Sequence, residues 1–124
     1  MDQVLVLFSC PLVLFVKGGQ SMLERDYQKK LVKTLKDIFP GCVVLKNDAQ
    51  LKQGIPDLLV LYRDKWAALE VKRSESEYRK AVTGKGRPNQ DYKVERMNKM
   101  SYAAFIYPEN EEKIFSELKE VFAS

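Results

Sequence analysis

Three charged side chains in two short motifs have the types and the spacing for metal chemistry. Gly54-Ile55-Pro56-Asp57 precedes an apolar run, and after twelve further residues the sequence reads Glu70-Val71-Lys72. Side chains alternate between the two faces of a strand, so Glu70 and Lys72 share one face. Two carboxylates at the end of a strand can hold a hard divalent cation, which prefers oxygen ligands and keeps several waters. We therefore expect Asp57, Glu70 and the backbone carbonyl of Val71 to bind Mg2+ or Mn2+.

The same three side chains allow two interpretations. An ion between Asp57 and Glu70 could stabilise charge on a phosphodiester and lower the pKa of a bound water, which Lys72 would orient, or Lys72 would neutralise the phosphate. The alternative is an ordinary cross-strand salt bridge, which is common in sheets and contributes little to stability. The Glu-x-Lys tripeptide alone does not decide between them, because so short a motif has almost no specificity.

The turn between the two strands determines whether the carboxylates meet. With an even-numbered loop, of which Asp64-Lys65 is the two-residue case, Asp57 lies opposite Lys72 and diagonal to Glu70. A three-residue loop places Asp57 opposite Val71, which points to the other face. A shared site therefore requires the even-numbered register or a compensating bulge.

Taken together, the two motifs resemble the signature of the PD-(D/E)XK nuclease superfamily. The leading helix, the Gly-x-Pro-Asp hairpin and a following helix that opens with Pro88-Asn89-Gln90 resemble its VRR-NUC branch, the virus-type replication-repair nucleases. The similarity extends from Met22 to about Pro108. It implies a Mg2+- or Mn2+-dependent endonuclease that hydrolyses phosphodiester bonds in DNA. The active-site residues that it implies are Glu24, Asp57, Glu70, Lys72 and Gln90.

The resemblance also implies a class of substrate and an assembly. Stand-alone members of that family, found in phages and prophages, are similar to Holliday-junction resolvases and include homodimers that cut branched DNA. We therefore expect a homodimer that acts on branched or four-way junction DNA in the cytoplasm of a bacterial or phage-infected cell. A single small domain has little surface for reading a base sequence, which also favours selection by DNA structure.

Two of the implied site residues have simpler explanations. Ser21 can cap the first helix with Glu24 three residues later, and glutamate in such a capping box stabilises a helix for local reasons. Gln90 could bind phosphate or support Lys72, although a glutamine in the first turn of a helix is often only solvated.

The apolar spacing predicts one α/β domain over residues 22–124, with a restriction-endonuclease-like core. We expect the order αβββαβ plus a C-terminal helix, and a mixed four-stranded sheet flanked by helices. The apolar run over 57–62 predicts a strand that is buried on both faces. The expected helices cover residues 22–39, 88–100 and 110–122, and the expected strands cover 42–45, 57–62, 66–72 and 103–107.

The segment from Arg73 to Arg87 is polar and basic, and we interpret it as a mobile loop beside the metal. Its phosphate contacts would be independent of base sequence, and Tyr78 could stack on an unpaired base. The alternative is a solvated loop whose charge is diluted by Glu75 and Glu77. The expected nucleic-acid-binding residues are Lys46, Lys52, Arg73, Arg79, Lys80, Lys85 and Arg87.

The composition narrows the classes of chemistry. The chain has 21 Lys and Arg, 17 Asp and Glu and a net charge of +4, which suits a phosphate-bearing partner. It contains no histidine, which excludes histidine-ligated zinc, Ser-His-Asp triads and Cys-His nucleophiles. Cys10 and Cys42 form no CxxC pair, so we expect reduced thiols.

Residues 1–21 form an apolar leader that we expect to be translated upstream sequence or disordered. The run from Val4 to Val16 falls short of the ~20 residues that span a bilayer, and no basic residue precedes it as in a signal peptide. Lys17-Gly18-Gly19 can be encoded by AAA-GGA-GG, a bacterial ribosome-binding sequence, so we expect translation to begin at Met22.

Two other functional classes remain open from sequence. A catalytically inactive nucleic-acid-binding module of the same fold would bind DNA without Mg2+ and would be indifferent to Lys72→Ala. A protein-interaction domain would show no salt-dependent DNA binding. Intact charged side chains at the end of a strand favour the enzyme, because burying charge is costly without a function.

Overall fold

The computed structural model describes residues 22–47, 55–83 and 89–124, with only the backbone of residues 89–92. The expected leader 1–21 and the predicted DNA contacts Lys52, Lys85 and Arg87 lie outside these residues. The elements are α1 (Glu24–Ile38), β2 (Val43–Lys46), β3 (Leu58–Tyr62), β4 (Lys65–Val71), α2 (Glu75–Thr83), α3 (Asn89–Met100), β5 (Tyr102–Ile106), the short 3-10 helix η1 (Pro108–Asn110) and α4 (Glu111–Ala123).

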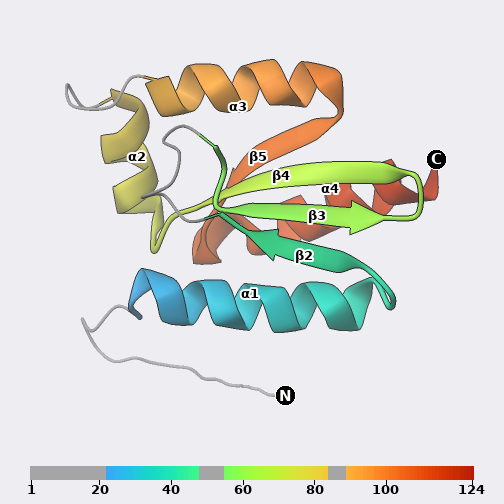
Figure 1. The fold of residues 1–124 in the computed structure, drawn as a ribbon. Coiled ribbons are helices and arrows are strands. Elements are labelled where there is room, and N and C mark those ends of the chain that lie inside the picture. The colour runs from blue at the N-terminus through green and yellow to red at the C-terminus, as the bar shows by residue number, and fades with distance from the viewer. Residues whose placement is uncertain (1–21, 48–54, 84–88) are drawn as a thin grey trace.

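The four strands form one mixed sheet, as predicted, and their order in it is β2-β3-β4-β5 (Figure 1). The pairs β2–β3 and β3–β4 are antiparallel, whereas β4 and β5 are parallel. A parallel pair needs a long crossover, which α2 and α3 provide. The sheet is therefore an α/β arrangement in which β3 and β4 are the central strands.

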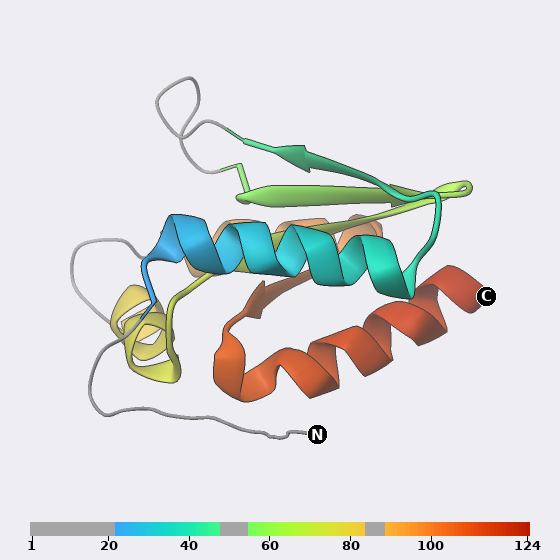
Figure 2. The same cartoon turned by 90° about the horizontal axis from the view of Figure 1, so that it is seen from below.

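One face of the sheet carries the main hydrophobic core. Figure 2 shows α1 and α4 side by side on this face. Leu31 and Leu35 of α1, Leu69 of β4 and Leu118 of α4 belong to one buried cluster and are at most 1% exposed. Removing such a leucine side chain typically costs 2–5 kcal/mol, so this cluster fixes where α1 stands against the strands.

The opposite face has a smaller core under α2 and α3. Ala68 of β4 and Ala103 of β5 pack with Val94 of α3 and with Phe105. The small alanine side chains let α3 approach the sheet closely. The prediction that the strand 57–62 is buried on both faces is wrong, because Leu59 and Leu61 on this second face are only partly buried.

Helix α1 begins without the predicted cap. Leu23 is the N-cap residue, with an extended backbone (φ −64°, ψ 148°) and no side-chain cap hydrogen bond. Glu24 is therefore the first helical residue, and the predicted capping box, in which Glu24 would be the third, is wrong; Ser21 itself lies outside the described residues. Gly41, at φ 90°, reverses the chain after the helix in a conformation that glycine adopts readily.

The β3–β4 hairpin has the predicted even-numbered loop, but one residue earlier than expected. Tyr62 pairs with Lys65, so Arg63 and Asp64 form the two-residue turn. Arg63 adopts φ 59°, in the left-handed region that such turns require. The expected pairing of Asp57 with Lys72 is wrong by two residues, since Leu58 pairs with Leu69 and the register continues to Asp57 opposite Glu70.

The segment after β4 is a helix instead of the predicted mobile loop. The Ser74 hydroxyl accepts a hydrogen bond from the Glu77 amide (3.2 Å), and Glu109 accepts one from the Glu75 amide (3.0 Å). Both satisfy free amides in the first turn of α2, which would otherwise lack partners. The sequence Ser74-Glu75-Ser76-Glu77 is a capping-box pattern, and this local signal for α2 was missed.

None of the helices in the described ranges has an apolar stretch long enough to cross a membrane.

Candidate active site

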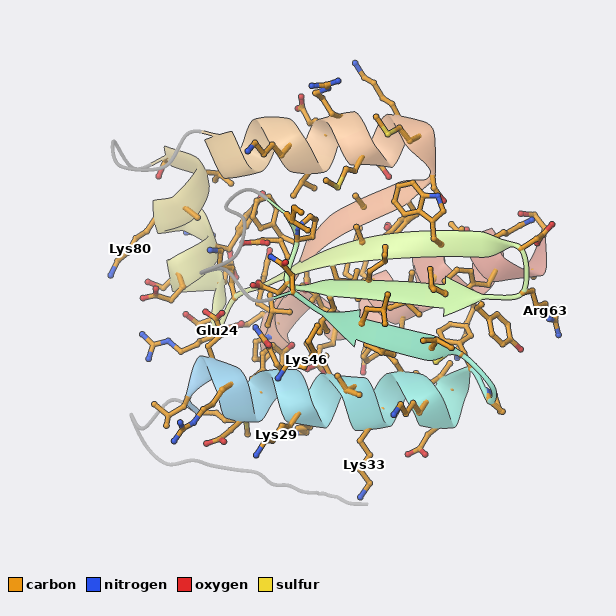
Figure 3. All side chains as sticks on the ribbon, viewed as in Figure 1. Glu24, Lys29, Lys33, Lys46, Arg63 and Lys80 are labelled. Carbon is orange, nitrogen blue, oxygen red and sulfur yellow. The ribbon has the colours of Figure 1, made fainter. Side chains whose placement is uncertain are left out.

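The candidate site lies at one end of the sheet, where β3 begins and β4 ends. Helix α1 also begins at this end, and Figure 3 shows Glu24 and Lys46 on the same side of the molecule. Asp57 immediately precedes β3, while Glu70 and Val71 are the last residues of β4. Segments far apart in the sequence thus bring their charged side chains to one place.

Asp57 and Glu70 are held against each other by backbone hydrogen bonds. The Val71 amide donates to Asp57 Oδ2 at 2.9 Å. The Asp57 amide in turn hydrogen-bonds the Glu70 carboxylate and lowers its pKa. These reciprocal contacts fix both carboxylates on the face of the sheet that carries α2 and α3.

Lys72 completes a cluster of three charged side chains. Its Nζ lies 3.8 Å from Glu70 Oε2, and the two side chains are 16% and 10% exposed. The Lys72 amide donates to the carbonyl of Ile106 at 2.9 Å, which continues the pairing of β4 with β5. The ammonium group is therefore fixed beside the two carboxylates by the sheet itself.

The environment of Glu70 disfavours its negative charge. Glu70 is the only buried charged residue within the described ranges, at 8% exposed. Burial, followed by the charge of Asp57, raises the pKa of Glu70 to about 7, although Lys72 opposes the shift. Burial also raises the pKa of Asp57, against the Val71 amide and the charge of Lys72. One ammonium group is insufficient compensation for two carboxylates in this position.

Glu24 lies near the cluster, on the helix that packs against the other face of the sheet. Glu24 lies seven and eleven residues before Leu31 and Leu35, on the helix face that points to the core. Although the residue is largely exposed, partial burial and then the charge of Asp57 raise the pKa of Glu24, while Lys72 and Arg73 lower it. Its carboxylate also accepts a hydrogen bond from Gln28 at 3.3 Å. With the capping box absent, Glu24 belongs to the site's electrostatic surroundings.

The donor types in this cluster fit a hard divalent cation. Within the described part of the chain, no three His, Cys, Asp or Glu side chains converge as a complete metal cage. Mg2+ does not require one, since it is usually held by one or two carboxylates together with waters and substrate phosphates. Asp57, Glu70 and the Val71 carbonyl supply only oxygen, which suits Mg2+ or Mn2+.

The remaining predicted site residues differ in how much of them the structure describes and in their contacts with the site. Gln90 is the second residue of α3, which begins at this end of the sheet in Figure 1, but its side chain lies outside what is described. Lys46 ends β2, and its charge lowers the pKa of Asp57. The Asn47 amide donates to the carbonyl of Asp57 at 2.9 Å, a contact that the sequence did not indicate.

The described basic side chains of residues 73–83 form ion pairs within the protein. Arg73 and Lys80 pair with Glu77 at 3.6 and 3.7 Å, and Arg79 pairs with Glu75. These ion pairs reduce the positive charge that we expected this segment to offer to DNA, so Glu75 and Glu77 dilute it as the alternative interpretation held.

Tyr78 packs inside the protein instead of projecting toward a nucleic acid. Its ring lies 5.0 Å from the ring of Phe105 and 5.0 Å from that of Tyr107, measured between centroids. These contacts occupy the aromatic surface that was predicted to stack on an unpaired base. That prediction is wrong, because Tyr78 anchors α2 to the sheet.

No protein-family model matches this chain, and neither a curated protein nor a solved structure matches it. The two motifs and the site's geometry therefore carry the functional argument by themselves.

Proposed function

We propose that this protein is a Mg2+- or Mn2+-dependent endonuclease that hydrolyses phosphodiester bonds in DNA, with a restriction-endonuclease-like core. The observation that carries the proposal is the pair of carboxylates formed by half-buried Asp57 and buried Glu70, with Lys72 Nζ 3.8 Å from Glu70. The three side chains occupy the end of two central strands. The resemblance of their two motifs to the PD-(D/E)XK signature supports the same conclusion.

The electrostatics argue against a simple salt bridge among these side chains. In a stabilising salt bridge the cation lowers the pKa of its carboxylate partner. Here burial raises the pKa values of both Asp57 and Glu70, and the charge of Asp57 adds to the shift at Glu70, so Lys72 does not offset the cost of the negative charge. A second cation at the pair would relieve that repulsion, which is the expected property of a metal site before the metal binds.

Each side chain then has a role that its position allows. A bound Mg2+ or Mn2+ supplies charge neutralisation at the phosphate and a more acidic water. Asp57 and Glu70 hold the ion, and the backbone amide of Val71 keeps Asp57 oriented. Lys72 orients the attacking water or neutralises the phosphate, and Glu24 contributes negative charge from the start of α1. Gln90, in the first turn of α3, supports Lys72 or binds phosphate.

Branched DNA and a homodimer form the second part of the proposal. One domain of this size offers little surface for reading bases, which favours recognition of DNA shape. Two copies would present two such sites to two strands of a four-way junction.

The decisive experiment incubates purified protein with four-way junction, flap and linear duplex DNA in Mg2+, Mn2+ or EDTA. Cleavage should require the metal and favour a branched substrate, and Asp57→Asn should abolish it. The matched control is Asp64→Asn, since Asp64 is an 87% exposed side chain at the opposite end of the sheet and should be dispensable. Equal cleavage in EDTA, or by Asp57→Asn, would refute the mechanism. Metal-independent binding without cleavage would instead support the inactive-module alternative.

A further inference from the structure

Helix α1 carries a row of basic side chains that the sequence analysis did not single out. The α1 basic row consists of Arg25, Lys29, Lys33 and Lys36, all of them exposed. At 100° per residue these four side chains fall within an arc of about 80°, and the row is about 16 Å long. The signal in the sequence was the spacing of four, four and three residues, which repeats basic side chains on one helix face.

The row points away from the protein interior. Tyr27, Leu31 and Leu35 form the buried face of α1, roughly opposite the row on the helix. Figure 3 shows Lys29 and Lys33 extending from α1 on the side away from the sheet. The row is thus available to a partner along its whole length.

Ion pairs within the described ranges do not neutralise the charges of the row. Across the described ranges, no carboxylate forms an ion pair with any of the four side chains, in contrast to the basic residues of α2. The acidic residues of α1 near this face, Asp26 and Asp37, lie at one margin of the row. Lys30 is excluded from it, because Lys30 faces Glu111 and lowers the pKa of that carboxyl.

The row begins close to the candidate site. Arg25 follows Glu24 directly, and Glu24 lies close enough to Asp57 for the two charges to interact. Lys46, at the end of β2, lies next to α1 in Figure 3, and its charge lowers the pKa of Asp57. We propose that the α1 basic row binds the phosphate backbone of DNA whose neighbouring segment occupies the active site. This inference rests on the proposed nuclease function and names the surface that positions its substrate.

The dimensions and chemistry of the row suit nucleic acid. A length of about 16 Å corresponds to roughly five base pairs of duplex at 3.4 Å each, so three or four phosphate contacts are expected. A helix that binds a membrane surface needs apolar side chains beside its basic face. Tyr27, Leu31 and Leu35 of α1 are buried in the core, and Val32 and Ile38 are partly buried against it, so little apolar surface borders the row.

The test compares two triple variants of equal charge. Lys29→Gln, Lys33→Gln and Lys36→Gln together remove the lysines of the row, and glutamine preserves helix propensity. The control combines Lys99→Gln, Lys113→Gln and Lys119→Gln, three exposed lysines on α3 and α4. Both variants have a formal net charge of +1, three below the +4 of the native chain, so any effect of total charge is the same.

Binding is measured on a labelled four-way junction and a 30-base-pair duplex in EDTA, over a range of salt. The row variant should bind about ten-fold or more weakly at about 0.1 M salt, with a slope of log K against log salt reduced by 2 to 3, near 0.9 per lost contact. The control variant should keep the native slope. Thermal unfolding midpoints of both variants should stay close to that of the native chain, since surface substitutions usually change stability by about 0.5 kcal/mol or less.

The proposal is overturned if the row variant keeps the native salt slope, or if the control variant loses as much affinity. It is also overturned if the row is needed only for binding to vesicles containing phosphatidylserine. Metal-dependent cleavage by native protein together with unchanged binding by the row variant would refute the row and leave the nuclease function intact. Row-dependent binding without any cleavage in Mg2+ or Mn2+ would support the row and refute the nuclease function.

Discussion

The Glu70 carboxyl carries an energetic cost that should be measurable in the absence of metal. Its pKa of about 7 lies well above the ordinary value of 4.5, because the fold favours the protonated form. Protonated Glu70 contributes stability that is fully present below pH 4.5 and is lost as the pH rises through about 7. Above that pH the ionised pair of Asp57 and Glu70 strains the end of the sheet.

We therefore predict that, without metal, Glu70→Gln affects the stability of the protein more favourably at pH 8 than at pH 4. Glutamine cannot ionise, so the difference in unfolding free energy between variant and native chain should grow by up to about 3 kcal/mol across this interval. Urea unfolding in EDTA at both pH values measures it. Glu112→Gln, at an exposed position of α4, is the control and should show no such growth. A pH-independent difference for Glu70→Gln would contradict the prediction.

The same repulsion makes metal binding detectable without any DNA. Mn2+ or Mg2+ should raise the unfolding midpoint of the native protein at pH 8, and a concentration 100-fold above Kd stabilises by about 2.7 kcal/mol. Asp57→Asn should lose most of this shift, whereas Asp64→Asn should keep it. An unchanged midpoint for the native chain in either metal would argue against the site.

Lys72 should matter to catalysis more than to binding. Lys72→Met removes the ammonium group that lies beside Glu70, and we expect cleavage to slow by about 100-fold or more, as when a positioned catalytic group is lost. Binding of DNA in EDTA should change little. Lys65→Met, at the opposite end of β4, serves as the control. Native cleavage rates for Lys72→Met would show that the ammonium group has no part in the reaction.

At the scale of elements, the helix α2 reduces the positive charge that the segment after the site can offer to a partner. A helix fixed by Ser74, Glu109 and Tyr78 holds its basic residues in ion pairs with Glu75 and Glu77. In the described ranges, the basic row of α1 forms no such ion pairs, and α1 begins near the candidate site.

The capping of α2 can be tested directly. Ser74→Ala removes the hydroxyl that accepts the Glu77 amide and should destabilise the protein by about 1 kcal/mol. Ser76→Ala is the matched control two residues later, because Ser76 is an exposed residue inside the helix and alanine favours a helix there. Chemical unfolding of the two variants gives the comparison. Equal stabilities would mean that the Ser74 cap does not hold the helix.

At the scale of the whole molecule, α3 covers only part of its face of the sheet. An apolar groove of about 380 Å³ remains between α3 and β3, lined by residues that include Leu59, Leu61, Trp66, Met97 and Met100. Met100 is 67% exposed at the end of α3. Exposed apolar surface of this kind commonly marks a contact between proteins, and a second copy of the chain is the partner expected for a homodimer.

We predict that Met100→Lys weakens the homodimer without unfolding the domain. Sedimentation over a range of concentrations should give a dimer for the native chain and a larger dissociation constant for the variant, because a charge would enter the apolar contact. Met22→Lys, at another exposed apolar position, is the control. A native chain that sediments as a monomer at all concentrations would contradict the homodimer itself.

Local patterns in the sequence predicted most of the fold. The spacing of Tyr27, Leu31 and Leu35 predicts α1, and the apolar runs around Val60 and Leu69 predict the central strands, because these periodicities depend only on neighbouring residues. The motifs at Asp57 and Glu70 likewise indicate a shared carboxylate site. Alternation along a strand fixes the face of each side chain wherever the strand is formed.

The tertiary structure decided which side chains actually meet. Moving the turn to Arg63 and Asp64 kept the parity of the register, so Asp57 stayed on the face of Glu70, but it changed the residue opposite Asp57 from Lys72 to Glu70. Strand pairing, ion pairs and ring contacts join residues far apart in the chain, and their energies compete across the whole fold. For that reason the carboxylate motif could be recognised from the sequence alone, whereas the raised pKa of Glu70 and the lack of ion pairs to the α1 basic row within the described ranges required the three-dimensional arrangement.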